Sequence, residues 1–586
     1  MVDNTTFGKE PITIVEIDQD FCSLTYGNSP CTASVGVTGE FKCYNTFKTC
    51  QDTANYTLGS PLTLRFCTKT SNFPTPNETE LYIPIVQSVS TNPTEVNIAS
   101  GNENISPLGK RATVNITMID IPYNDLRVDK YTSDRGFDPR TKGTFWTKWL
   151  ARNPFYQNRI VRIREGYVGQ TVSSMRTRTY ILDKVSNVSS GNTVTIVARD
   201  ILGLANNKKA QAPSINTGSL SADLEENVTS FTLQPTGIGD EQYSSSGKLR
   251  IGEELMSFTR TNDDFTVERA IENTELSSHS QDDLVQECLE YVDQRVDVVI
   301  NDLLTTYGNV DSSFIPLSDW TEEADIWFSS TKLNAIISEP TGVTTLLGEI
   351  LRQTNTILWW DENAQEIKFR AVKPVTESDV IDIDETANII RNSFNSQVQA
   401  NQRLSQVWFY YDVQNPVKEL EETSNYSKLQ ISVDLTKETA NEYGEPRITK
   451  IFSRWLDDDG IATALSTAST IVATYKDNPE YITFSVDAKD RDIDISDIVR
   501  VNYRTIVDFQ GNLLNKLYYV ISRNETQSGH IVTYKAIRFA FEGRFSFIMA
   551  NGTPDYTPSF DDDQNACFIS DNNGFMSDGT EGWKIL

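Results

Sequence analysis

Residues 179–200 read TYILDKVSNVSSGNTVTIVARD, and residues 518–538 read YYVISRNETQSGHIVTYKAIR. Each stretch comes after a short apolar run, which is IVRI (160–163) in the first case and IVRV (498–501) in the second. Apolar and polar residues alternate on both sides of a Ser-Gly turn, a pattern typical of paired antiparallel strands. The repetition predicts two similar small β-barrels in one chain. Chance resemblance between short β motifs is the alternative.

The spacing of landmark residues agrees with a true repeat. Arg162 and Tyr180 lie 18 positions apart, and Arg500 and Tyr519 lie 19 positions apart. We therefore treat these two tyrosines as corresponding positions of the repeated unit.

The chain has 586 residues, enough for about three to five domains. Its net charge of −29 argues against a protein that binds nucleic acid by neutralising phosphates. No apolar run is long enough to span a membrane, and the first residues lack the basic and apolar regions of a signal peptide. A protein made in a reducing cytoplasm is the expectation, and in that compartment clustered cysteines favour metal binding over disulfides.

An enzyme is not expected. The chain has only two histidines, His279 and His530, which weighs against Ser-His-Asp hydrolysis and zinc peptidase chemistry. It contains no HExxH, GxSxG, P-loop or GxGxxG sequence.

Five of the seven cysteines lie within the first 67 residues. Four of them form two pairs, Cys22-x8-Cys31 and Cys43-x6-Cys50. These spacings bring sulfurs from separate loops, which suits an iron–sulfur cluster better than the close CxxC pairs of zinc ribbons, but zinc, disulfides and unused thiols stay open. Cys67, in the strand-like LTLRFCTK, is expected to be a core thiol.

The cysteine segment CSLTYGNSPCTASVGVTGEFKCYNTFKTCQD (22–52) resembles the cysteine domain of tail-tip proteins of long-tailed phages, the L family of lambda-like phages. The resemblance implies a [4Fe–4S] cluster, with zinc as the alternative, bound by Cys22, Cys31, Cys43 and Cys50. The chain departs from that family in the shorter x11 separation between the pairs and in the N-terminal position of the segment.

The rest of the chain resembles the tail hub family of phages, which includes the baseplate hub of contractile tails. Two β-barrels separated by mixed α/β material carry this likeness. The stretch LRIGEELMSFTR (249–260) is similar to a small inserted β module of tail proteins. The ending NNGFMSDGTEGWKIL also resembles this family. The resemblance implies a non-enzymatic homotrimer that closes the tail tube and supports host attachment and genome ejection. Three chains with two similar barrels each would present six near-equivalent barrels to a sixfold tail tube.

By this resemblance the protein belongs to the virion, at the tail tip, after assembly in the host cytoplasm. The implied partners are the distal tail protein ring, the tape measure protein and tail fibre or central tip proteins. DNA would pass through without being bound, since an acidic wall prevents sticking. The competing hypothesis is a secreted or surface adhesin stapled by disulfides, without a metal cluster.

The expected fold class is mainly β with α+β insertions. We expect six parts: a Cys-rich iron–sulfur domain (1–80), a first hub β-barrel (81–213), an inserted small β module (214–290), an α/β hub region (291–478), a second hub β-barrel (479–550) and an extended C-terminal arm (551–586).

Several local elements are also predicted. Helices are expected over 291–306, 343–355 and 461–477, from apolar residues at helical spacing. A hairpin is expected over 357–372, with its adjacent tryptophans 359 and 360 in core and interface positions. Within the inserted module, 248–260 and 264–271 are expected as adjacent strands.

Overall fold

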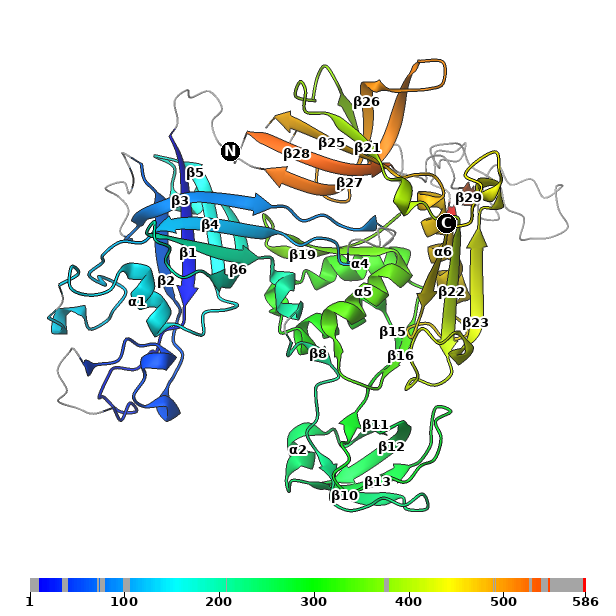
Figure 1. Ribbon diagram of the computed structural model, residues 1–586, viewed down its shortest axis with the longest axis horizontal. Coiled ribbons are helices and arrows are strands. Elements are labelled where there is room, and N and C mark those ends of the chain that lie inside the picture. The colour runs from blue at the N-terminus through cyan, green and yellow to red at the C-terminus, as the bar shows by residue number, and fades with distance from the viewer. Residues whose placement is uncertain are drawn as a thin grey trace.

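The structure is a computed structural model. It describes residues 10–33, 41–70, 73, 80–98, 106–136, 138–206, 208–373, 379–487, 490, 492–525, 530–538, 546–548 and 583–585. Figure 1 shows several β-sheets grouped around a region of short helices, with a small β module projecting from one end. The fold is therefore mainly β with few helices, as expected from the sequence.

Seven strands close into a barrel, which we call the first β unit. In sheet order they are β1 (Pro11–Gln19), β2 (Leu62–Thr68), β3 (Ile83–Asn92), β4 (Thr113–Ile119), β7 (Thr193–Arg199), β6 (Arg176–Val185) and β5 (Ile160–Tyr167). All neighbours are antiparallel except β2 and β3. Helix α1 (Phe145–Arg152) adds Phe145, Trp146 and Trp149 to the barrel core.

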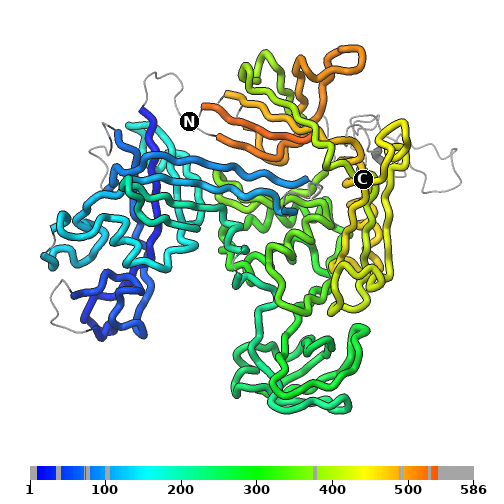
Figure 2. Tube along the Cα trace, viewed as in Figure 1, coloured from blue at the N-terminus to red at the C-terminus, as the bar shows by residue number. Residues whose placement is uncertain are grey.

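The composition of this barrel corrects the expected domain boundary at residue 80. Strands β1 and β2 both belong to the barrel, because β1 pairs with β2 on one side and with β5 on the other. The cysteine segment is thus an insertion between two barrel strands, and the tube in Figure 2 follows it out of the barrel and back again. The domain boundary could not be predicted from the sequence, because the pairing of β1 with β5 joins residues that lie far apart and leaves no local pattern.

Six further strands form one sheet, which we call the second β unit. Its order is β20 (Val380–Asp384), β26 (Ile498–Val507), β27 (Leu513–Glu525), β28 (Ile531–Arg538), β25 (Glu480–Asp487) and β21 (Asn395–Val398). The described residues do not close this sheet, so the prediction of a second closed barrel is not confirmed. Two of its strands, β20 and β21, also come from the part of the chain assigned to the α/β region.

The two units share their strand register. Val161 pairs with Tyr180 in the first unit, and Val499 pairs with Tyr518 in the second, so equivalent residues are numbered 338 apart. Both units carry a bulge at the same place, between Leu182 and Lys184 and between residues 520 and 522. Tyr180 and Tyr518 are both fully buried.

This register corrects one assignment. The counterpart of Tyr180 is Tyr518 and not Tyr519, so the spacing from the strand arginine is 18 residues in both units. Side chains alternate between the two faces of a strand, so a slip of one residue exchanges the faces. Tyr519 accordingly packs in the central core, as does its true counterpart Ile181.

The central region packs helices against small sheets around the largest apolar core. Its helices are α3 (Val296–Asp302), α4 (Leu317–Trp327), α5 (Val343–Thr354) and α6 (Ile461–Tyr475). Its strands are β8 (Gln211–Ala212), β15 (Leu289–Gln294), β16 (Leu333–Ile337), β17 (Thr341–Gly342), β18 (Thr356–Asp361), β19 (Glu366–Ala371), β22 (Gln406–Val413), β23 (Tyr426–Val433) and β24 (Ile448–Phe452).

Most local predictions in this region are confirmed. Helices α5 and α6 and the hairpin of β18 and β19 lie where expected, and Trp359 and Trp360 are buried. The indole of Trp360 donates to the Thr179 carbonyl at 2.9 Å and so joins the hairpin to the first β unit. The helix predicted from residue 291 begins only at Val296, because the preceding residues pair as β15 with β16.

The inserted module is a β structure, as the sequence indicated, and its strands form one six-stranded sheet. Its strands are β9 (Ser219–Leu220), β10 (Ser230–Gln234), β11 (Ser246–Ile251), β12 (Glu254–Thr261), β13 (Asp264–Glu268) and β14 (Gln286–Glu287), with the short helix α2 (Ile238–Gln242). The stretch 248–260, expected as one strand, folds into β11 and β12 around Gly252. Glycine suits this turn because its φ is +57°.

At the other end of the chain, β29 (Ser546–Ile548) pairs with β30 (Trp583–Ile585). The arm predicted over 551–586 otherwise lies outside the described residues. Within the described residues, none of the helices has the length and apolar character needed to cross a membrane.

A buried carboxylate holds the inserted module together. Glu254 has no exposed surface; it forms an ion pair with Arg269 at 2.7 Å and a hydrogen bond with His279 at 2.9 Å. Burial raises the pKa of Glu254, but hydrogen bonds from Arg269, His279 and the Ser277 amide outweigh it and keep the pKa below its ordinary value.

We predict that Glu254→Gln destabilises the module by about 3–5 kcal/mol, because it leaves Arg269 buried without its counter-charge. A carboxyl with a lowered folded pKa stabilises above its unfolded pKa, and this stability is lost as the pH falls through the folded pKa. The wild-type module should therefore lose stability in acid and Glu254→Gln should lose less. Hydrogen exchange of β11–β13, corrected for intrinsic rates, measures both effects.

The matched control is the neighbouring variant Glu253→Gln, whose side chain is 84% exposed beside Arg250. It should change the module's stability by no more than about 0.5 kcal/mol. Equal exchange in the two variants would contradict the role of Glu254.

Candidate metal centre

The cysteine segment leaves the barrel after β1 and returns at β2. Its described parts contain only two short 3-10 turns, Phe47–Thr49 and Thr53–Asn55. Cys22 forms a β-bridge with Leu58, and its amide donates to the Asn45 carbonyl at 2.8 Å. A segment with so little regular structure depends on side-chain contacts for its shape.

The structure brings all four predicted site cysteines together. They line one small cavity, whose walls are Cys22, Leu24, Tyr26, Cys31, Cys43, Asn45, Thr46, Cys50, Asp52, Asn55 and Tyr56. Cys22 is buried, the other three are half-buried, and all four are free thiols.

The other cysteines lie elsewhere. Cys67 is fully buried in a small apolar core with Ile12, Ile14 and Met175, and burial raises its pKa to about 11. This confirms the prediction of a core thiol. Cys288 is also buried, with its pKa raised to about 12, and Cys567 lies outside the described residues.

The electrostatics of the cavity depend on how many thiols are ionised. Burial raises the pKa of Cys43 and of Cys50, and negative charge on the other site cysteines raises both further. Backbone amides act in the opposite direction: Asn45 donates to Cys43, and the Asp52 amide lies 3.4 Å from the Cys50 sulfur. Four thiolates alone would repel one another, so the ionised set needs a cationic group between them.

The donor set is of the kind that binds metal through thiolates. A single zinc requires four ligand atoms within about 2.3 Å of one point. Among the described residues, no group of three or more His, Cys, Asp or Glu is placed to hold one metal ion. Four thiols around a common cavity, two of them with amide donors, are a ligand set that zinc and iron–sulfur clusters both use.

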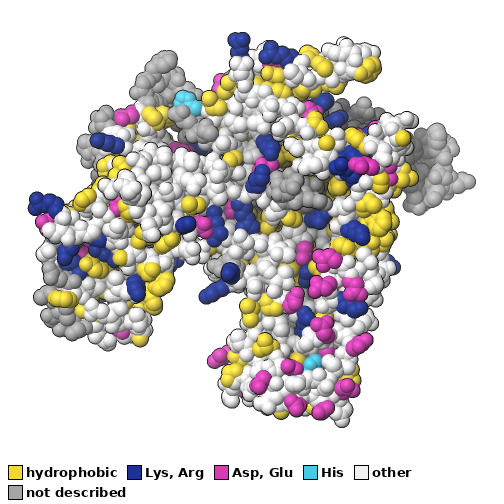
Figure 3. Space-filling view, in the orientation of Figure 1, with side chains coloured by type: hydrophobic (Ala, Val, Ile, Leu, Met, Phe, Trp, Pro, Cys, Tyr) yellow, Lys and Arg dark blue, Asp and Glu magenta, His cyan; other side chains and the backbone are white. Residues whose placement is uncertain are grey.

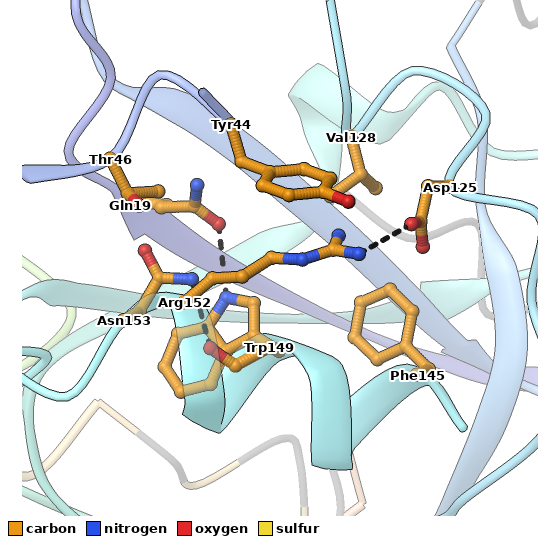
Figure 4. Close-up of a pocket in the computed structure, with 9 residues that line it drawn as sticks. All are labelled: Gln19, Tyr44, Thr46, Asp125, Val128, Phe145, Trp149, Arg152 and Asn153. Carbon is orange, nitrogen blue, oxygen red and sulfur yellow. Dashed lines mark hydrogen bonds and ion pairs between the residues drawn. The ribbon is translucent and has the colours of Figure 1, made fainter. Parts of the chain in front are cut away.

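A tyrosine between two arginines fixes the segment to the barrel side. The guanidinium groups of Arg135 and Arg152 lie 3.9 and 3.8 Å from the ring centre of Tyr44. Two groups this close cannot share one face, so the ring is held between them. Figure 4 shows the Arg152 guanidinium beneath the Tyr44 ring and bonded to Asp125 at 2.8 Å.

Arg135 also contacts the cysteine backbone directly. Its guanidinium donates to the carbonyls of Lys42 and Cys43, both at 3.0 Å, and forms a buried ion pair with Asp129. On the same side, the Tyr26 amide donates to the Tyr131 hydroxyl at 2.7 Å. The segment between β4 and α1 therefore acts as a bracket for the cysteine loops.

Sequence reasoning missed this bracket entirely. Its residues follow β4, and Arg135 lies 92 positions beyond Cys43, whose carbonyl it contacts. Arginine, tyrosine and aspartate at irregular spacing give no pattern that distinguishes them from other surface polar residues.

Comparisons with known proteins give likenesses of fold only. No protein-family model matches the chain, and no curated protein matches it. Among solved structures, the chain is similar to a tail protein from Neisseria meningitidis MC58, with 11% identity over 74% of this chain and 89% of that chain and a TM-score of 0.35. It is similar to the 43 kDa tail protein of prophage MuSo2 from Shewanella oneidensis, with 10% identity over 78% and 97% and a TM-score of 0.34.

A third solved structure is an E. coli component of the type VI secretion system, with 6% identity over 78% of this chain and 74% of that chain and a TM-score of 0.30. These three solved structures are two tail proteins and one component of the type VI secretion system.

We predict that Tyr44→Ala loosens the cysteine segment by about 1–3 kcal/mol, because it removes the ring that two guanidinium groups contact. Hydrogen exchange over residues 41–58 should accelerate while the barrel strands stay protected.

Tyr443→Ala is the matched control, since Tyr443 is 37% exposed and also lies against a guanidinium, that of Arg403 at 4.3 Å. It should leave residues 41–58 unchanged. Unaltered exchange in Tyr44→Ala would show that the tyrosine does not anchor the segment.

Proposed function

We propose that this chain is a structural hub protein of a phage tail tip. The observation that carries the proposal is the repeated β unit: two units of one chain share strand register, bulge position and buried tyrosine. Such a duplication has a mechanical use where rings of different symmetry meet. A homotrimer of this chain offers six near-equivalent units to a sixfold tube, with no second interface type.

In this proposal both units act as small hub barrels that face the tail tube. The inserted module and the cysteine segment are side structures carried by the ring. Figure 3 shows acidic side chains spread over the projecting module. The partners would be the distal tail protein ring above, and tape measure and tip proteins along the axis, while DNA passes an acidic wall during ejection without being bound.

For the cysteine segment we propose a [4Fe–4S] cluster held by Cys22, Cys31, Cys43 and Cys50. The support is the shared cavity, the amide donors and the resemblance to phage tail-tip proteins. When bound, the cluster would supply four metal–sulfur bonds that tie together a segment with almost no regular structure. The proposed role is structural: the cluster stiffens a loop that starts and ends on neighbouring barrel strands.

We predict that Cys43→Ser lowers the iron content from about four per chain to near zero and unfolds the cysteine segment. The barrel should persist, because its core contains no residue of that segment. Iron and acid-labile sulfide in anaerobically purified protein provide the measurement.

The control is Cys67→Ala, which removes a thiol of the β2 core and should keep the full iron content. A Cys43→Ser protein that retains its iron would contradict the ligand assignment. Zinc without sulfide in the wild type would favour the zinc alternative, and disulfides without metal would favour the adhesin hypothesis.

We also predict that the purified chain forms a homotrimer, visible as three times the chain mass in light scattering or native mass spectrometry. A monomer in assembled particles, or a sixfold ring of this chain, would contradict the hub proposal. The iron measurement is independent of this result, so the two parts of the proposal fail separately.

A further inference from the structure

One side chain in the wall of the cysteine cavity carries a buried polar group that bonds to nothing. The hydroxyl of Tyr56 is shielded from solvent and has no hydrogen-bond partner among the described residues. A buried tyrosine hydroxyl usually finds a partner, because leaving it unpaired costs the free energy of removing it from water. An unpaired hydroxyl in this wall therefore points to an acceptor inside the cavity.

Backbone contacts place Tyr56 beside the first of the four cysteines. The chain that follows the tyrosine runs along the start of the cysteine segment. The Ser23 amide donates to the Thr57 carbonyl at 3.0 Å, and Cys22 forms a β-bridge with Leu58. These contacts lie directly on either side of the two residues, so Tyr56 and Cys22 face the cavity from adjacent pieces of backbone.

The electrostatic surroundings of the hydroxyl agree with this position. Burial raises the pKa of Tyr56 to about 12, and negative charge at Asp20, Cys22 and Cys50 adds to the rise. A phenol with a raised pKa keeps its proton at neutral pH, so its oxygen has a proton to donate. Tyr56 is thus a hydrogen-bond donor within the electrostatic reach of two of the four site cysteines.

The ring of Tyr56 is held in place by its neighbours. It packs edge-on against Phe47, with the ring centres 5.2 Å apart, and Phe47 packs in the same way against Phe155 at 6.4 Å. The residue also closes the 3-10 turn Thr53–Asn55, because its amide donates to the first carbonyl of that turn at 3.3 Å. The ring and the backbone together fix where the hydroxyl lies.

The four cysteine sulfurs differ in the hydrogen-bond donors that they already have. Cys43 and Cys50 each have a backbone amide as donor. No described group donates to the sulfur of Cys22 or Cys31, and of these two only Cys22 is buried, at 7% exposed. A buried thiolate that binds a metal is stabilised by hydrogen bonds from the surrounding protein. Cys22 is therefore the ligand that most needs a donor.

We propose that the Tyr56 hydroxyl donates a hydrogen bond to the Cys22 thiolate when the cluster is bound. This inference rests on the proposed [4Fe–4S] cluster and adds a residue that tunes it without binding the metal. A hydrogen bond to a ligand sulfur stabilises the more negatively charged form of a cluster, which is its reduced form. Tyr56 therefore acts through Cys22, and its effect is a raised reduction potential.

A second unpaired atom in the same wall defines the competing interpretation. Asn45 is 1% exposed, and its side-chain nitrogen donates to the carbonyls of Cys22 and Leu24 at 3.0 and 3.3 Å. Its side-chain oxygen is buried and has no partner among the described residues. A water molecule between this oxygen and the Tyr56 hydroxyl would satisfy both groups without any bond to sulfur. Only the bond to sulfur would change the reduction potential directly.

The direct test is Tyr56→Phe, which removes the hydroxyl and keeps the ring against Phe47. The variant should retain the full iron content. At a fixed solution potential, its ratio of reduced to oxidised cluster should fall about tenfold, which is about 59 mV for a one-electron couple. A redox titration of the anaerobically purified full chain, followed by the electron paramagnetic resonance signal of the reduced cluster, measures this ratio.

Tyr26→Phe is the matched control. Tyr26 lines the same cavity, but its hydroxyl already donates to the side-chain oxygen of Gln51 at 2.8 Å. This variant should keep the ratio of reduced to oxidised cluster within about twofold of the wild type. Replacing Tyr56 by 3-fluorotyrosine keeps the hydroxyl and makes it a stronger donor, so the ratio should rise by about two- to threefold. This second replacement tests the bond even if Tyr56→Phe does not hold its cluster.

The outcomes separate the bond from the cluster. Full iron content and an unchanged potential in Tyr56→Phe would overturn the bond, favour the water bridge to Asn45 and leave the cluster standing. Equal falls of the ratio in Tyr56→Phe and Tyr26→Phe would indicate a general loosening of the cavity and would also overturn the bond. A wild-type chain without iron would overturn the cluster, and the role of Tyr56 with it.

Discussion

The constraint on which both β units depend is the register of three consecutive strands. One face of these strands is buried, so a slip by one residue would turn every core side chain to the opposite face. Tyr180 and Tyr518 mark this constraint: each is the fully buried residue that pairs with the valine of the preceding strand. The bulge that follows in each unit keeps the same position, so the duplicated sequence has retained its hydrogen-bonding pattern along with its apolar residues.

Around this conserved register, the surroundings of the tyrosines have diverged. In the first unit, Arg178 pairs with Glu165 of β5 at 2.8 Å and also lies 3.7 Å from Glu362, which comes from the turn between β18 and β19. In the second unit, Lys516 pairs with Glu480 of β25. Burial and the neighbouring carboxylate raise the tyrosine pKa in both places. Both units thus keep a cation two residues before the tyrosine, but the carboxylate that pairs with it lies on a different strand, and only the first unit adds a carboxylate from the central hairpin.

The cysteine segment depends on the barrel for its ends and for its support. Gln19 and Leu62 are paired residues of β1 and β2, so the intervening chain is a loop whose two ends are held together. Because its ends are held by the barrel, the cysteine segment has already lost part of its conformational freedom. A cluster would need to fix only the middle of the segment. The Tyr44 contacts with Arg135 and Arg152 add a third attachment, from a part of the barrel that sequence order places far away.

By itself, the sequence determined the features that depend on residues close together in the chain. Alternating strands around a turn gave the repeat, helical spacing gave α5 and α6, and two cysteine pairs gave the four thiols that meet in one cavity. Only the tertiary structure decided which strands share a sheet. Because β1 pairs with both β5 and β2, the cysteine segment is an insertion in the barrel. Because residues 291–294 pair with β16, the helix predicted from residue 291 begins later, as α3. Strand pairing joins residues far apart in sequence, and such pairs leave no periodic signal in either partner.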